Sequence, residues 1–134
     1  MPRKCVHCAD GTAMQRFEHE TFVIERKGLK AKLDDLSGWR CPQCDEIEFD
    51  AESARRYAAA GDDLVIKSRR RTGEWIRRIR KKLNLTQAEA AWLTGGGHNA
   101  FSRYERAEVE PLPAVINLFR LLDKHPDLLK ELSE

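Results

Sequence analysis

Four cysteines in two pairs are the residues whose type and spacing most directly predict chemistry. The pairs are Cys5-x-x-Cys8 and Cys41-x-x-Cys44, with 32 residues between them. A C-x-x-C turn places two thiolates on one side of a tight loop, and two such turns complete a tetrahedral site with sulfur at about 2.3 Å from a zinc ion. We therefore expect one structural Zn2+ per chain, held by all four cysteines. Catalytic zinc is not expected, because four sulfur ligands leave no open coordination position.

Other roles for the thiols stay open at this point. A thioredoxin-like redox centre uses one C-x-x-C pair in a βαβ context, which this sequence lacks, and inert thiols are a further alternative. His7 lies inside the first pair and could replace a cysteine as ligand, although the four thiols already fill the coordination shell. The distance between the pairs exceeds the common spacing of about 15–20 residues. A hairpin predicted between the pairs accounts for the extra length.

A second pattern lies in residues 85–105, which have the signature of a helix, a turn and another helix. Thr86 is a good N-cap, and Glu89 three residues later completes a capping-box pattern. Gly95, Gly96 and Gly97 are expected to end the first helix and to allow a sharp reversal with positive φ. The second helix is predicted to begin at His98 or Asn99.

The second helix carries side chains suited to contacts with DNA bases. Asn99 and Arg103 are four positions apart and lie on one face of the helix, and His98 adjoins that face. Asparagine pairs well with adenine edges and arginine with guanine edges in the major groove. We predict sequence-specific binding to double-stranded DNA, with Asn99, Arg103 and His98 as base-reading residues. Simple surface polarity is the alternative explanation.

Contacts to the DNA backbone are expected from polar and basic residues near this helix. Residues 67–82 contain nine Lys and Arg residues against the single acid Glu74. Such a run could be only a solvated face, but beside a helix-turn-helix it favours phosphate contacts, which set the register without reading sequence. The predicted backbone contacts are Gln87, Ser102, Arg69, Arg70, Arg71 and Lys81. The three consecutive arginines are expected to precede the first helix and to embrace the DNA backbone or a groove edge.

The elements that position the cysteines are predicted to be strands. Residues 21–24 and 29–33 show strand propensity or alternation, Lys27-Gly28 between them resembles a hairpin turn, and another strand is expected to end at Trp39-Arg40. A domain of about 50 residues with few large apolar side chains buries too little surface to fold alone, so zinc is expected to supply folding energy. His19 has no predicted partner.

The rest of the chain is predicted to be helical. Residues 51–72 form a partly helical linker, with Gly61-Asp62-Asp63 as an interruption and a hinge. Five helices around one core follow, with Phe101, Tyr104 and Trp92 expected in that core. The predicted fold is therefore a two-domain α+β chain. Residues 1–66 form a small β-rich zinc-binding domain with four cysteine ligands and a helical linker from about 51, and residues 67–134 form an all-α, five-helix helix-turn-helix domain.

Charge is divided unevenly between these two parts. Residues 1–66 hold 10 Lys and Arg against 13 Asp and Glu, whereas residues 67–134 hold 14 against 9. The balances of −3 and +5 suit a basic half that meets nucleic acid and an acidic half that meets something else. The sequence contains neither an apolar run of about 18 residues nor a secretory signal, so no membrane association is expected. We expect a cytoplasmic protein, in which clustered cysteines favour metal or redox chemistry over disulfides.

The chain resembles the MqsA antitoxins, which pair with the ribonuclease toxin MqsR, over nearly its whole length. The resemblance rests on the two C-x-x-C pairs ahead of a linker and on segments 80–87 (RKKLNLTQ), 95–105 (GGGHNAFSRYE) and 121–129 (LLDKHPDLL). The second half is similar more broadly to the Xre/Cro class of DNA-binding domains. The glycine-rich segment is far more specific than a generic helix-turn-helix.

The resemblance implies a zinc-binding N-terminal domain that docks on the toxin. It also implies a C-terminal domain that forms a homodimer and binds a palindromic operator of its own operon. The zinc ligands of the family match the four cysteines here, and its base-reading residues match Asn99 and Arg103. His98 stands where we associate an apolar residue with the family, so base preference is expected to differ.

We therefore predict a non-enzymatic antitoxin that represses its own operon. The acidic residues of segment 45–52 could face a basic ribonuclease, although a solvated acidic turn explains them equally well. A strand edge of the hairpin could instead add to a sheet of the toxin. The alternatives from other classes are a stand-alone zinc-containing transcription regulator without a toxin and a thiol redox enzyme.

Overall fold

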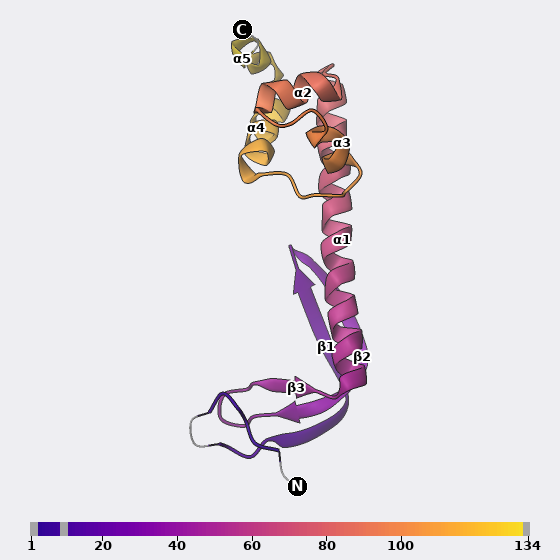
Figure 1. Ribbon diagram of the computed structural model, residues 1–134, viewed down its shortest axis with the longest axis vertical. Helices are drawn as coiled ribbons and strands as arrows, with labels where there is room; N and C mark the ends of the chain where they lie inside the picture. The colour runs from indigo at the N-terminus through magenta and orange to yellow at the C-terminus, as the bar shows by residue number, and fades with distance from the viewer. Residues whose placement is uncertain (1–2, 9–10, 133–134) are drawn as a thin grey trace. The chain divides into compact units, whose positions relative to one another are not determined.

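The computed structural model describes residues 3–8 and 11–132, and the chain divides into two compact units, residues 1–65 and 66–134 (Figure 1). The elements are β1 (Gln15–Arg26), β2 (Leu29–Arg40), β3 (Ile47–Phe49), α1 (Ala51–Lys82), α2 (Gln87–Thr94), α3 (Ala100–Glu105), α4 (Pro113–Lys124), the 3-10 helix η1 (Pro126–Leu128) and α5 (Leu129–Leu132). Helix α1 belongs to both units. A three-stranded sheet with a cysteine cluster followed by helices agrees with the predicted α+β class.

The first unit is built on the predicted hairpin. Strands β1, β2 and β3 form an antiparallel sheet in that order. Lys27 and Gly28 both have positive φ, 55° and 80°, as the two-residue type I′ turn requires in order to match the twist of the strands. Strand β2 ends at Arg40, as expected. The hairpin is therefore confirmed with its turn.

An aromatic cluster joins this sheet to the first turns of α1. The rings of Phe17, Phe22, Phe49 and Tyr57 lie with neighbouring centroids 4.9 to 6.2 Å apart. Tyr57 is on α1 and Phe49 is on β3, so their contact holds the helix against the sheet. Tilted and edge-on pairs of this kind add to the stability supplied by burial of the rings.

The hairpin contains an irregularity at which two non-glycine residues take left-handed conformations. His19 and Asp35 have φ of 54° and 63°, and the β1–β2 register shifts on both sides of Glu20. The imidazole Nδ1 of His19 lies 2.5 Å from a carboxylate oxygen of Asp35. The sequence offers no partner for His19, but the bulge brings it to Asp35, 16 residues away, while its side chain stays exposed to solvent.

This pair predicts a pH dependence of the hairpin. The hydrogen bond and charge of Asp35 raise the pKa of His19, and the same contact with His19 lowers the pKa of Asp35. The pair therefore stabilises the hairpin fully between about pH 4 and 6.5. The stabilisation is lost as the pH rises through the raised pKa of His19, or falls through the lowered pKa of Asp35. An NMR pH titration should place the His19 midpoint above its ordinary value, and Asp35→Asn should return it; an unchanged midpoint in Asp35→Asn would contradict the assignment.

Helix α1 corrects the expected interruption in the linker. It runs without a break for 32 residues, through Gly61-Asp62-Asp63. One glycine inside a helix costs only about 1 kcal/mol relative to alanine, and its neighbours from Ala58 to Ala60 favour helix. The Arg26 guanidinium of the hairpin also lies against Gly61. A break predicted from one glycine is overcome by the helical neighbours and by this contact.

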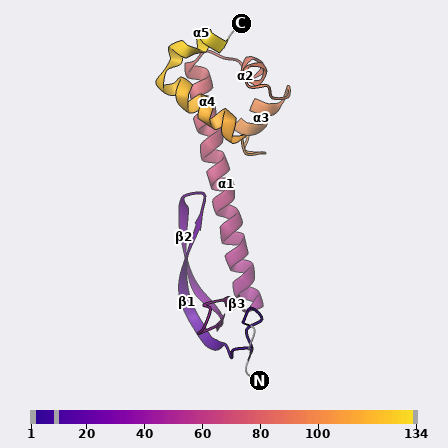
Figure 2. The same cartoon turned by 90° about the vertical axis from the view of Figure 1, so that its left-hand side faces the viewer.

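The second unit packs helices α2, α3 and α4 around the C-terminal part of α1 (Figure 2). Phe101 and Phe119 are fully buried with ring centroids 5.3 Å apart, and Tyr104 packs edge-on against Phe101. The α1 face that meets them carries Ile76 and Ile79 at helical spacing. The predicted helical core is confirmed for these aromatic residues. Among the described residues, no helix is long and apolar enough to cross a membrane.

Candidate metal centre and nucleic-acid interface

The hairpin brings the two cysteine pairs together. Its register places Gln15 opposite Arg40, so the chain entering β1 lies beside the chain leaving β2. The first pair precedes β1 and is held by a backbone hydrogen bond from the Cys5 N–H to the Thr12 carbonyl, 2.8 Å, while Cys41 directly follows β2. The hairpin therefore accounts for the long spacing between the pairs.

The four sulfur atoms form one cluster. They all lie within 4.8 Å of one another, and the Cys5–Cys44 and Cys8–Cys41 sulfur pairs are 3.6 Å apart. A tetrahedral ion with bonds of about 2.3 Å requires sulfur separations of about 3.8 Å, so the cluster fits a metal of zinc size. His7 is not in the cluster; its imidazole lies 3.4 Å from Glu46. The four cysteines thus form a possible metal site with the ligands that were predicted.

The acidities of the thiols also suit a bound cation. Backbone N–H groups of Cys44 and Gln43 lower the pKa of Cys41 to about 7. Interactions with the sulfurs of Cys44 and Cys41 raise the pKa of Cys8 to about 12. The Cys41 thiolate therefore forms readily, whereas ionisation of Cys8 is opposed because a second negative charge would lie close to the first. A metal ion removes this opposition by neutralising the thiolates.

Helix α2 and the turn after it have the predicted geometry. The Thr86 hydroxyl accepts a hydrogen bond from the Glu89 N–H, and the Glu89 carboxylate accepts one from the Thr86 N–H. This capping box lowers the pKa of Glu89. Gly95 ends the helix with φ 73°, and the Gly96 N–H reaches back to the Ala91 carbonyl at 2.9 Å. These contacts confirm the capping box and the glycine stop.

The candidate base-reading residues lie at the start and on the exposed side of α3. The helix begins at Ala100, with Asn99 as N-cap, one or two residues after the predicted start. The Asn99 side chain makes no capping hydrogen bond, so its amide is available to a ligand. His98, Asn99 and Arg103 are exposed, and Arg103 lies 3.6 Å from the Glu108 carboxylate. Their role in base contacts stays a prediction.

The candidate phosphate contacts are placed differently from what was expected. Arg69, Arg70 and Arg71 are inside α1 and do not precede it. Consecutive residues of a helix point about 100° apart, so the three side chains cannot all face one DNA strand. Arg70 and Arg71 are exposed, and Arg69 is partly buried, with an Nε that has no hydrogen-bond partner among the described residues. The expectation that the three arginines precede the first helix is wrong, because α1 continues through them. Their contact with the DNA backbone stays a prediction.

The remaining phosphate candidates differ in accessibility. Lys81 is exposed on α1, and Ser102 is partly buried on α3. Gln87 is also partly buried, and its Nε2 donates a hydrogen bond of 3.3 Å to Glu105. Gln87 therefore has a role inside the unit, joining the start of α2 to the end of α3, which the sequence pattern did not reveal.

A buried ion pair was not evident from the sequence. The Arg80 guanidinium donates to both oxygens of Glu105 at 2.8 and 2.9 Å, and the side chains are only 11% and 6% exposed. Arg80 also donates to the Leu85 carbonyl at 2.8 Å. Glu105 raises the pKa of Arg80. From the sequence alone, Arg80 counts among the solvated basic residues. Its position four residues after Ile76 places it on the apolar face of α1 and was the available signal of burial.

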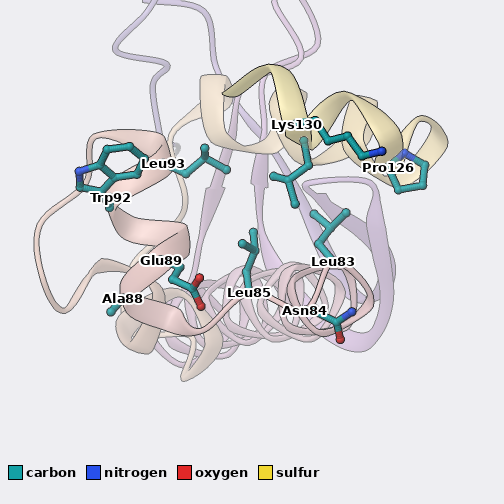
Figure 3. A pocket seen from close by; sticks show the side chains of 10 residues that line it. Leu83, Asn84, Leu85, Ala88, Glu89, Trp92, Leu93, Pro126 and Lys130 are labelled. Carbon is teal, nitrogen blue, oxygen red and sulfur yellow. The ribbon is translucent and has the colours of Figure 1, made fainter. Parts of the chain in front are cut away.

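Trp92 was expected in the core, and this expectation is wrong. Its side chain is 68% exposed, beside an apolar pocket between α2 and the segment formed by η1 and α5 (Figure 3). Ala90 and Ala91 are the buried residues of α2. Trp92 is about 100° further round the helix and so points away from the face that they bury. Four consecutive apolar residues cannot all face one core in a helix.

The acidic segment 45–52 is largely paired within its own unit. Arg16 donates to both carboxylate oxygens of Asp50 at 2.7 Å, and Arg3 bonds Glu48 at 2.8 Å. Glu52 is paired with Arg55 at 2.6 Å. These internal partners reduce the negative potential that the composition alone suggests, which favours the solvated acidic turn as its explanation.

Comparison with known proteins covers both candidate sites. The family model for the antitoxin component of a bacterial toxin-antitoxin system, MqsA, matches residues 3–133. Antitoxin MqsA of Escherichia coli (strain K12) is 37% identical over 131 residues, which cover 96% of this chain and 98% of the E. coli protein. The match therefore extends across the cysteine cluster and across α2 and α3.

Proposed function

Because the chain belongs to the MqsA antitoxin family, we propose that it neutralises an MqsR-like ribonuclease toxin through residues 1–66 and represses its own operon through residues 67–134. The chain is an antitoxin of a toxin-antitoxin system and not an enzyme. Such a protein acts by stoichiometric binding in the cytoplasm, so its two surfaces carry the whole function.

The observation that best supports DNA binding is the side chain of Asn99, which precedes α3 and makes no capping hydrogen bond. Asparagine is among the best N-cap residues, yet the Asn99 amide makes no cap hydrogen bond. Arg103 follows one turn later, and its N–H donates to the Asn99 carbonyl. The pair supplies amide and guanidinium groups that suit adenine and guanine edges in the major groove, with exposed His98 beside them. The excess of basic residues after position 66 supports phosphate contacts.

A homodimer through the second unit is part of the proposal. One helix-turn-helix contacts only one half-site, and paired half-sites lie about 34 Å apart on DNA, so a dimer matches a palindrome. Leu112 and Leu121 at α4 are 65% and 55% exposed. Leucines exposed singly are common on protein surfaces, so the proposed dimer rests on the spacing of the half-sites.

The cysteine cluster supports one structural Zn2+ per chain, held by Cys5, Cys8, Cys41 and Cys44. The ion would neutralise the thiolates and tie the two ends of the hairpin together. The hydrophobic cluster around it is small, comprising Cys5, Met14 and Cys41 with Cys8 and Trp39 packed against it. Metal binding therefore supplies stability that this core lacks.

For the toxin we favour docking at the edge of β1. Strand β1 pairs with β2 and has no further strand on its other side among the described residues. Its Phe22–Arg26 part keeps a regular register, and Val23 is 65% exposed. An edge strand of this kind can add to a partner's sheet through main-chain hydrogen bonds. The internally paired acidic segment is a weaker candidate.

The second candidate function is a zinc-containing transcription regulator without a toxin. A stand-alone regulator would have the same DNA surface and the same metal site, so the neighbouring gene distinguishes the two functions. An antitoxin has a small basic protein encoded beside it that stops growth when expressed alone. Co-purification of the two proteins would support the antitoxin function, and failure to bind would favour the stand-alone regulator. One zinc ion bound per chain, without turnover of dithiol substrates, would argue against a thiol redox enzyme.

Asn99→Ala and Arg103→Ala test the base contacts. Each is expected to weaken operator binding by about 1–3 kcal/mol and to relax specificity at one base pair, because each removes a paired contact in the groove. DNA shift assays at fixed salt, with the promoter region of its own gene as probe, measure the effect. Arg55→Ala, which removes an exposed arginine of the first unit, is the control. Toxin binding and zinc content should survive all three changes, and unchanged operator affinity in both reader variants would disprove the assignment.

A further inference from the structure

Gly73 lies in the interior of α1 at the point where that helix meets the end of α3. It is buried, although its helix is otherwise rich in long side chains. A Cβ atom placed on it would be 2.5 Å from the Tyr104 carbonyl oxygen and 3.3 Å from the Glu105 Cα. Both atoms belong to the backbone of α3. The two helices therefore approach so closely that only glycine fits at position 73.

The obstacle to a side chain here is rigid. Glycine destabilises a helix interior relative to alanine, so the close approach is what makes glycine suitable at this position. A flexible side chain could move away from a new methyl group, but the carbonyl of Tyr104 is part of a helical turn. Tyr104 also packs edge-on against Phe101 of the same helix, and Phe101 is buried against Phe119 of α4. A side chain at position 73 would therefore push the end of α3 away from α1.

The same face of α1 makes a second contact with the end of α3, through Arg80. Arg80 is seven residues after Gly73, close to two full turns, and so lies on the same face. Its two hydrogen bonds to Glu105 attach the residue that follows Tyr104. Gly73 sets the distance between the helices, and the ion pair holds them there.

We propose that Gly73 is a positioning residue, which orients α3 for base contacts by letting its last turn rest directly on α1. This inference rests on the proposed DNA-binding function. Helix α3 has only six residues, too few to bend, so a shift at Tyr104 tilts the whole helix. The tilt moves Asn99 and Arg103, at the other end and on the outer face, relative to the bases.

The test compares Gly73→Ala with Gly61→Ala in the full-length zinc-loaded protein. Gly61 is also buried inside α1, but the three atoms nearest to a Cβ there all belong to the flexible Arg26 guanidinium, at 3.4 to 3.6 Å. We expect Gly73→Ala to lose at least about tenfold in affinity for the promoter region of its own gene, since base contacts depend on orientation. Affinity for a shuffled duplex of equal length should fall less than about threefold, because phosphate contacts carry no sequence information. Gly61→Ala should leave both affinities unchanged.

A double-mutant cycle separates positioning from general destabilisation. If Gly73 acts through the base contacts, Asn99→Ala will reduce promoter affinity by a smaller factor in the Gly73→Ala variant than in the natural protein. Equal loss of affinity for both duplexes, or strict additivity with Asn99→Ala, would overturn the inference.

A second variant keeps the test decisive if Gly73→Ala does not fold. Arg80→Lys keeps the positive charge beside Glu105 but removes the planar fork, so it loosens the same attachment. Selective loss of promoter affinity in this variant supports the inference, and unchanged promoter affinity opposes it. If the natural protein itself fails to distinguish the promoter from the shuffled duplex, the proposed function fails, whereas normal discrimination in Gly73→Ala defeats only the inference.

Discussion

Cys41→Ser is expected to abolish metal binding and to unfold the sheet of residues 1–65. Cys41 is completely buried directly after β2, and backbone N–H groups lower the pKa of its thiol to about 7. Structural zinc in small domains contributes on the order of 10 kcal/mol, which is more than the total stability of many small domains. Removal of the metal from the natural protein with a chelator should have the same result.

Metal content, circular dichroism and the NMR signals of the hairpin measure this effect. Pro42→Ala changes an exposed residue of the same turn that offers no ligand atom, so it should keep both metal and fold. DNA binding by residues 67–134 should remain largely intact in Cys41→Ser, because their core contains no cysteine. Loss of DNA binding as well would mean that the two units depend on each other for folding. A hairpin that stays folded without metal would show that the cluster is not a structural site.

Arg80→Met is expected to destabilise the second unit by about 3–5 kcal/mol, because it leaves the Glu105 carboxylate buried without its partner. The ion pair joins α1 to the end of α3, and Arg80 also satisfies the Leu85 carbonyl between α1 and α2. The loss therefore affects three helices at once. Chemical unfolding followed by the fluorescence of Trp75 and Trp92 measures the change.

Two further variants give this prediction its controls. Arg77→Met removes an exposed arginine of the same helix and should change stability by no more than about 0.5 kcal/mol. Arg80→Met combined with Glu105→Leu should recover much of the loss, because apolar replacement of both partners of a buried pair is often close to neutral. If Arg80→Met costs no more than Arg77→Met, the ion pair does not hold α3 in place.

Features set by neighbouring residues were predicted more accurately than features set by distant ones. The hairpin turn at Lys27-Gly28, the capping box of α2 and the stop at Gly95 were all predicted. Each depends on the conformational preferences of residues within four positions of one another. The clustering of the four cysteines was also predicted, because two C-x-x-C turns carry their geometry within themselves.

The wrong predictions came from residues whose surroundings are set by other elements. The sequence predicts a break at Gly61, but the helix on both sides and the hairpin keep this residue helical. The hydrophobicity of Trp92 predicts a place in the core, but α2 buries only the face that carries Ala90 and Ala91. Arg69, Arg70 and Arg71 are expected ahead of the first helix, but α1 begins at Ala51 and contains all three.

By itself, the sequence determined the pairing of the cysteines, the capped helix with its glycine stop and the helical core, because spacing along the chain encodes them. Only the tertiary structure decided how α3 is held. Arg80 and Glu105 are 25 residues apart, Gln87 and Glu105 are 18 apart, and Gly73 meets the backbone at Tyr104. Contacts between such distant residues follow from the way helices pack, and short-range periodicity does not record which partner a buried polar side chain will meet or which glycine a second helix will contact.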